Sequence, residues 1–180
     1  MTEAPNVVSW PRWSPDGQRL RFTVWDGVTT TANLWELKRD GALRQLFLGW
    51  QKANWVCCGE WTADGRYYLF QGDGQYWSVR DRQFAGNLEP AILTTMGVRV
   101  YSAAVNPLSD TIYASVGQGE IQDIFRWDLN PTHTPSILNQ ELKTAAVNFS
   151  PDGQWIAYSH GVPTGYERWR ARADGSEKLK

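Results

Sequence analysis

Apolar and polar residues alternate along short stretches of this chain, and turn residues separate the stretches. Within residues 19–24, three apolar side chains alternate with three polar ones. The pairs Tyr68/Phe70 and Ile156/Tyr158 repeat this spacing further along the chain. Alternation of this kind places one set of side chains on each face of a β-strand, and no long stretch has helical periodicity. The pattern therefore predicts an all-β protein of short antiparallel strands.

One phrase recurs at the start of each alternating stretch. It reads RWSPDG at 12–17, EWTADG at 60–65 and NFSPDG at 148–153, and a degenerate copy without Asp-Gly occupies 104–110. The copies lie 43 to 48 residues apart. Aspartate favours a turn by bonding its own backbone, and glycine permits positive φ. The predicted turn residues are Asp16, Gly17, Asp64, Gly65, Asp152 and Gly153.

Each repeat holds four predicted strands, and the third is centred on an aromatic residue. A period in the forties with four short strands is typical of a β-propeller blade. We therefore expect a β-propeller of four-stranded antiparallel blades, with repeats at about 5–48, 55–94, 101–138 and 144–180. The aromatic residues that we expect to pack between blades are Trp13, Trp35, Trp61, Trp77, Phe125, Phe149 and Trp169.

The two ends of the chain fall at the same point of the repeat. Met1 and Thr2 stand where a preceding fourth strand would end, and residues 178–180 stand where the last fourth strand would begin. Four blades are therefore present, the last incomplete. An open array leaves blade faces and strand edges unprotected, so we expect a fragment of a larger ring, completed by further blades or by a second chain.

Three tryptophans do not fit the repeat, and they predict a binding surface. Trp25, Trp50 and Trp55 lie in connections that share one rim of a propeller, and aromatic and arginine residues are common anchors of binding surfaces. The alternative is that these rings only cap the gaps between blades. The other predicted ligand or partner residues on this rim are Arg99, Tyr101, His160 and Tyr166.

The only two cysteines are adjacent, Cys57 and Cys58. Neighbouring Cα atoms are ~3.8 Å apart, which is closer than in ordinary disulfides. Vicinal bridges can act as redox devices, and adjacent thiolates can hold soft metals. We favour instead two small buried residues leading into a strand, because no histidine or third cysteine lies nearby, and their redox state stays open.

Composition and motifs serve mainly to exclude classes of function. The formal net charge is −1 and the pI about 6.1, so no overall basic field points to nucleic acid. Sequence motifs for a hydrolase, a metal site or a nucleotide site are missing, and the only histidines are His133 and His160. We therefore expect no enzyme activity, cofactor or metal.

The sequence leaves the cellular location open. The first residues lack the charged and apolar regions of a secretion signal, and no apolar run approaches the ~18 residues of a membrane span. If the chain is a fragment, these absences say nothing about its parent. Both the cytoplasm and the periplasm are open.

The phrases WSPDG and FSPDGQWIAY, each followed by an aromatic strand and a DG turn, resemble the WD-like repeat of TolB-type β-propellers. The stretch PRWSPDGQRLRFTVWD with NLWELKRDG and CCGEWTADGRYYLFQ resembles propellers attached to bacterial winged-helix transcriptional regulators. This resemblance implies a non-catalytic module for protein or ligand recognition, the sensor or interaction part of a regulator. Its alternatives are the gating propeller of a prolyl-oligopeptidase-type peptidase without its hydrolase domain, and a periplasmic TolB-like scaffold.

Overall fold

The structure is a computed structural model. The chain divides into two compact units, Met1–Thr95 and Met96–Lys180. The predicted features at Met1, Thr2, Asp110 and His133 lie outside the described residues. The structure describes residues 6–48, 50, 52–80, 90–92, 99–109, 111–118, 121–128, 136–142 and 144–180.

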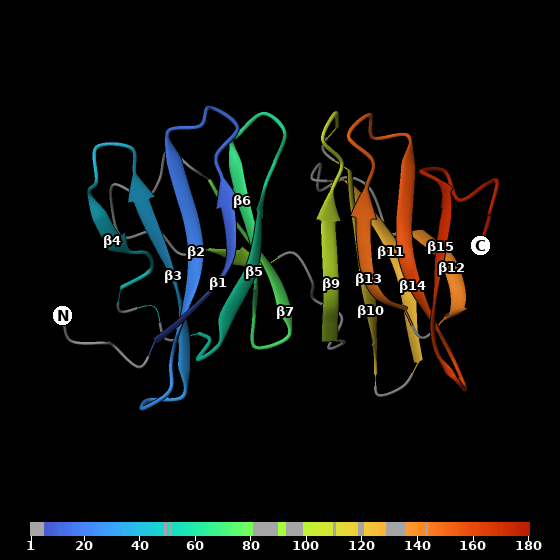
Figure 1. Cartoon of the computed structure of the whole chain (residues 1–180), viewed down its shortest axis with the longest axis horizontal. Helices are drawn as coiled ribbons and strands as arrows, with labels where there is room; N and C mark the ends of the chain where they lie inside the picture. Colours follow the sequence, from blue (N-terminus) through green and yellow to red (C-terminus); the bar gives the residue numbers. More distant parts are fainter. Residues whose placement is uncertain are drawn as a thin grey trace. The chain divides into compact units, whose positions relative to one another are not determined.

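Unit one consists of two four-stranded antiparallel sheets whose strands follow one another in chain order (Figure 1). The first sheet contains β1 (Asn6–Trp13), β2 (Arg19–Asp26), β3 (Thr31–Lys38) and β4 (Leu43–Gln45). The second contains β5 (Val56–Trp61), β6 (Tyr67–Gly72), β7 (Gln75–Arg80) and β8 (Ala91–Ile92). The predicted first strands end at the expected residues, Trp13 and Trp61.

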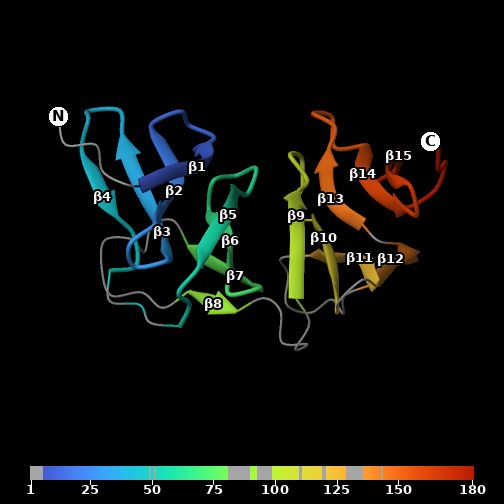
Figure 2. The same ribbon diagram turned by 60° about the horizontal axis from the view of Figure 1, so that its bottom comes forward.

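Among the described residues, unit two contains one four-stranded and one three-stranded antiparallel sheet, and Figure 2 shows them from a second direction. Leu179 forms an antiparallel bridge with Arg170 of the last strand, where the fourth strand of that sheet was expected to begin. The predicted fold class is confirmed: four antiparallel sheets, the last with three strands. The strands of unit two are β9 (Arg99–Val105), β10 (Thr111–Gln118), β11 (Ile121–Asp128), β12 (Ser136–Leu142), β13 (Thr144–Phe149), β14 (Trp155–Val162) and β15 (Gly165–Arg172).

The repeated phrase forms the turn between the first two strands of its sheet. The glycines at 17, 65 and 153 have φ of 66°, 67° and 64°, a region that glycine adopts without a steric penalty. In one turn the Asp64 carboxylate accepts hydrogen bonds from Thr62 Oγ1 at 2.7 Å and from the Arg66 backbone N–H at 2.9 Å. The carboxylates of Asp16 and Asp152 accept equivalent bonds. The repeated phrase therefore specifies the turn between the first two strands, and its aspartates have a structural role.

The first strand of each sheet is also interrupted by a register shift. In β5, Cys58 and Gly59 together face a single residue of β6, and in β1, Trp10 and Pro11 occupy the equivalent place. Cys58 and Trp10 both have a left-handed backbone, with φ of 57° and 51°. This two-against-one pairing is a β-bulge, which redirects side chains relative to the regular alternation.

The core of unit one lies between the facing sides of its two sheets. Leu34 from β3 packs there with Tyr68 and Phe70 from β6 and Trp77 from β7. Trp61 joins this cluster and is only 7% exposed. Burial of large apolar side chains is the main favourable contribution to folding. Trp61 and Trp77 therefore pack between sheets, as expected.

The opposite side of the first sheet is more open than expected. The alternation predicted for β2 is confirmed, but Phe22 and its partner Trp35 on this side are only partly buried. Trp13 on this side is 59% exposed in this chain, and its packing against a further blade stays a prediction. The reason is that the second sheet covers the other side, where Arg21 and Thr23 are buried.

Unit two has its own core between two sheets. Tyr113 from β10 and Ile124 from β11 pack against Ile156 of β14. Phe149 and Trp169 pack at the margin of this cluster, and Phe125 is partly buried. The two units thus build their cores in the same way, from facing sides of consecutive sheets.

Candidate binding surface

Two partly exposed indole rings meet at one end of unit one. Trp25 lies near the end of β2 and Trp55 directly precedes β5, with ring centroids 6.2 Å apart. The two residues are 38% and 39% exposed. Ala32 pairs with Trp25 across the first sheet and forms a parallel bridge with Trp55. This indole pair (Trp25 and Trp55) offers a rigid aromatic surface of the kind that anchors protein partners.

The backbone around the indole pair is fixed by hydrogen bonds. Asn54 C=O accepts a bond from the Ala32 N–H at 3.0 Å. The Asp73 carboxylate accepts bonds from the N–H groups of Asn54 at 3.0 Å and Trp55 at 2.9 Å. The Asp73 N–H donates in return to Trp55 C=O at 3.0 Å. The Trp55 backbone is therefore held in place before any partner binds, which lowers the entropy cost of binding.

Trp50 lies apart from this pair. Its ring packs edge-on against Phe70 and Trp77, with centroids 5.8 Å and 5.1 Å apart, and it also contacts Phe47. Trp50 is partly buried against the core of unit one. Sequence position alone grouped it with Trp25 and Trp55 because all three lie in connections on one rim.

The other predicted binding residues belong to unit two. The Arg99 guanidinium lies 5.7 Å from the centre of the Tyr101 ring, a cation–π distance. His160 of β14 pairs across the sheet with Glu167 of β15, and the exposed Tyr166 is adjacent. These residues form two small groups within their own unit, and their role in binding stays a prediction.

A buried ionic cluster in unit one was missed by the sequence analysis. Arg21 and Glu36 are fully buried and joined by two hydrogen bonds of 2.8 Å and 2.9 Å. Arg44 donates to the other Glu36 oxygen at 2.7 Å. The Arg21 guanidinium also lies 3.9 Å from the Trp61 ring centre. Arg21 and Glu36 occupy directly paired positions of β2 and β3, a register that the sequence of either strand alone does not reveal.

The charges of this cluster hold one another in the ionised state. Burial alone would raise the pKa of Glu36, but the charge and hydrogen bonds of Arg21, and then those of Arg44, keep its pKa below the usual range. Glu60, near Arg12 at 3.8 Å, behaves differently, since burial raises its pKa and the more distant arginine only partly opposes this. The cluster is thus a charged structural element between the two sheets.

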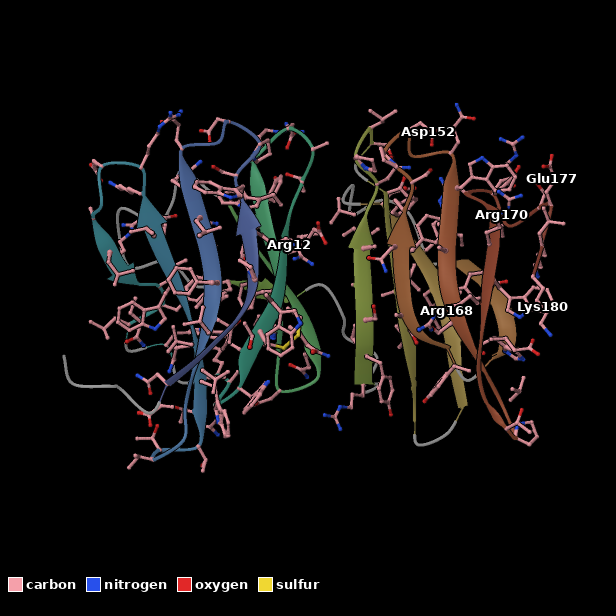
Figure 3. All side chains as sticks on the ribbon, viewed as in Figure 1. Arg12, Asp152, Arg168, Arg170, Glu177 and Lys180 are labelled. Carbon is pink, nitrogen blue, oxygen red and sulfur yellow. A yellow bond between two sulfur atoms is a disulfide. The ribbon has the colours of Figure 1, made fainter. Side chains whose placement is uncertain are left out.

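Cys57 and Cys58 are joined by a disulfide bond (Figure 3). The sequence left the redox state of the pair open and disfavoured a bridge only because neighbouring Cα atoms lie so close. Regular alternation would send adjacent side chains to opposite faces of the strand. The bulge at Cys58 and Gly59 breaks that alternation, so the two sulfur atoms can converge.

The described residues hold no cluster of three or more His, Cys, Asp or Glu side chains that could bind a metal ion. In the same part of the chain, no helix is long and apolar enough to span a membrane.

Comparisons with known proteins agree on the fold. No protein-family model matches the chain. Among curated proteins, the chain is 23% identical over 184 residues to an uncharacterised protein from Agrobacterium fabrum, covering 97% of this chain and 58% of that protein. The chain thus spans little more than half the length of this relative.

Solved structures of similar shape include TolB proteins. TolB from Agrobacterium tumefaciens matches with a TM-score of 0.74 and 19% identity, over 98% of this chain and 62% of that one. TolB from Acinetobacter baumannii matches with the same TM-score and identity, over 93% and 41%. An oligogalacturonate lyase from Vibrio parahaemolyticus matches with a TM-score of 0.73 and 14% identity, over 99% and 54%. The chain therefore has a TolB-like β-propeller fold, which is shared by enzymes and by other proteins.

Proposed function

We propose that this chain is a non-catalytic recognition module that binds an extended segment of a protein partner through the indole pair. The observation that carries the proposal is the contact between two partly exposed indole rings on a backbone fixed by Asp73. Interface energy concentrates in such rigid aromatic anchors. TolB proteins among the structural neighbours support a propeller of this type.

In a longer protein, we propose, this module is the sensor or interaction part of a bacterial transcriptional regulator. The resemblance of the repeat phrases to propellers of such regulators supports this role. A scaffold of the TolB type is the second candidate, and the TolB-like neighbours favour it. The domain next to this region in its parent protein distinguishes the two roles, since a neighbouring winged helix supports only the regulator role.

The test uses the whole chain as bait for a displayed library of random peptides. Peptides enriched on the chain are then measured by fluorescence titration against Trp25→Ala, Trp55→Ala and, as a matched control, Trp13→Ala. Trp13 is an exposed tryptophan of the same unit on a different side of the first sheet.

We expect each of the two indole-pair variants to weaken binding by about tenfold or more, the loss typical of a hot-spot residue. The control should bind as the unmodified chain does. Equal affinity of all four proteins, or a loss confined to Trp13→Ala, would overturn the proposed surface.

A further inference from the structure

Cys57 and Cys58 form a disulfide that cannot act as a cross-link of the fold. The two residues are adjacent in sequence, so the bond closes no loop of intervening chain. In the chain-entropy account, a disulfide stabilises a protein by restricting the loop that it closes in the unfolded state. This bond has no such loop to restrict. A chemical role therefore explains the pair better than a stapling role.

The site that holds the two cysteines is built by the blade and does not depend on cysteine. The bulge of β5 recurs at the equivalent place in β1, where Trp10 also has a left-handed backbone. The conformation that lets the two sulfurs converge thus recurs in the first strands of both sheets of unit one. Gly59 completes the bulge, because a Cβ there would lie only 2.2 Å from the Tyr68 hydroxyl.

The two sulfur atoms have different surroundings. Cys57 is 2% exposed, whereas Cys58 is partly accessible. Gln71, paired with Cys57 across the sheet, places its Oε1 atom 3.4 Å from the Cys57 sulfur. A thiol at Cys57 could donate a hydrogen bond to this oxygen after reduction. Cys58, the more exposed of the two residues, is therefore the one that we assign to meet an incoming reagent.

We propose that Cys57 and Cys58 form a redox-active vicinal pair, built by the β5 bulge, that exchanges electrons with dithiol compounds or dithiol proteins. A thiolate of the reductant attacks Cys58 Sγ, the Cys57–Cys58 bond breaks, and Cys57 leaves as a thiolate that takes up a proton. The second thiol of the reductant then attacks its own sulfur in the mixed disulfide and releases Cys58. The pair gains two electrons and two protons, and the reductant becomes a disulfide.

The first experiment follows this reaction in the full chain by mass spectrometry. We expect dithiothreitol to convert the chain to a form in which both cysteines are alkylated by iodoacetamide after unfolding, and oxidised glutathione, with release of two reduced glutathione molecules, to restore the blocked form. Phenylarsine oxide, which binds two neighbouring thiols with loss of water, should protect both reduced cysteines at one equivalent, because soft thiolates prefer soft ions. The melting temperature should be the same in both redox forms.

Two matched variants test whether the bulge is what allows neighbouring cysteines to form a disulfide. In a chain with Cys57→Ser and Cys58→Ser, the substitutions Ser9→Cys and Trp10→Cys place a new pair at the β1 bulge. The substitutions Glu167→Cys and Arg168→Cys place a control pair in β15, whose pairing with β14 is regular. We expect reversible bridging within one chain at β1 and none at β15.

Several results would overturn the proposal. They are free thiols at Cys57 and Cys58 under oxidising conditions, a bridge that resists the dithiol in the folded chain, and equal bridging by the β1 and β15 pairs. A marked fall of the melting temperature on reduction would also overturn it, because the bond would then be a structural element. Circular dichroism of every variant confirms that the comparison is made between folded chains.

Discussion

The first and second sheets place a tryptophan at the same point of the repeat, and the two residues have opposite surroundings. Trp13 ends β1 and is 59% exposed, whereas Trp61 ends β5 and is 7% exposed. Arg21 of the first sheet stacks on Trp61 at 3.9 Å. The difference teaches that a repeat specifies the shape of its own sheet, while the neighbouring sheet decides what that shape buries.

The largest effect is expected from removing the buried ring. Trp61→Ala should lower the free energy of unfolding by about 3–5 kcal/mol, because a large buried side chain leaves a cavity. Trp13→Ala should lower it by less than about 1 kcal/mol, as for other exposed positions. Urea unfolding followed by circular dichroism measures both. Similar losses at the two positions would show that Trp13 is covered in solution.

The next effect concerns the charges that lie against Trp61. Glu36→Gln should cost about 3 kcal/mol or more, because it leaves the Arg21 guanidinium buried without its carboxylate. Asp128→Asn is the control, since its ion pair with Arg126 is long and partly exposed. We expect the control to cost less than about 1 kcal/mol in the same urea titration. Equal costs would contradict the role of the buried pair.

The equivalent turns of the two units offer a sharper comparison. A Cβ at Gly17 would meet no atom within 4 Å, whereas at Gly153 it would lie 2.4 Å from Asn106 Oδ1. Gly17→Ala should therefore cost about 1–2 kcal/mol, for positive φ alone. Gly153→Ala should cost more, because Asn106 also donates a hydrogen bond to Gly153 C=O at 3.0 Å. Thermal unfolding of both variants tests this order, which equal melting temperatures would refute.

The smallest effect is the pH dependence of the turn aspartates. Hydrogen bonds from Ser14 and from the Gln18 backbone lower the pKa of Asp16, and those from Ser150 and Gln154 lower the pKa of Asp152. The folded pKa of each lies below the unfolded pKa of about 4. Their contribution to stability is thus present above that pH and lost as the pH falls through the folded pKa.

Asn substitutions isolate this contribution. In Asp16→Asn and in Asp152→Asn, stability should fall less as the pH drops below about 4 than it does in the unmodified chain. Melting temperatures across acidic buffers measure this difference. Glu60 acts in the opposite sense, because its raised pKa makes its ionised form unfavourable in the fold. Glu60→Gln should therefore add stability mainly above its folded pKa. A pH profile identical to that of the unmodified chain would contradict either assignment.

Much of the fold could be predicted from the sequence because local signals and the repeat agree. The Asp-Gly turns fixed the ends of the strands on either side, and the alternation fixed which residues share a face. The identity of the buried face could not be predicted, since alternation is symmetric between the two sides of a sheet. Arg21 shows this well: it is polar and yet lies on the side that the second sheet covers.

The candidate site was harder to predict, for two physical reasons. Trp50 and Trp55 lie close together in sequence, but the chain between them turns, and only Trp55 contacts Trp25. A bridge between Cys57 and Cys58 was disfavoured because neighbouring Cα atoms lie closer than in ordinary disulfides. The bulge that reverses this expectation depends on the register of two strands, and that register is not visible in either strand alone.

The chain order of strands within each sheet has a consequence for how such a molecule can change over generations. Every sheet is made from one contiguous segment, so all strands of one sheet are synthesised before the next sheet begins. Recombination between the copies of the phrase at 12–17 and 60–65 would remove one repeat and connect β1 directly to β6. The new hairpin would join the first strand of one sheet, through the same turn, to the second strand of another, which is the pairing that both sheets already have. A lineage can therefore gain or lose blades without inventing a new strand pairing.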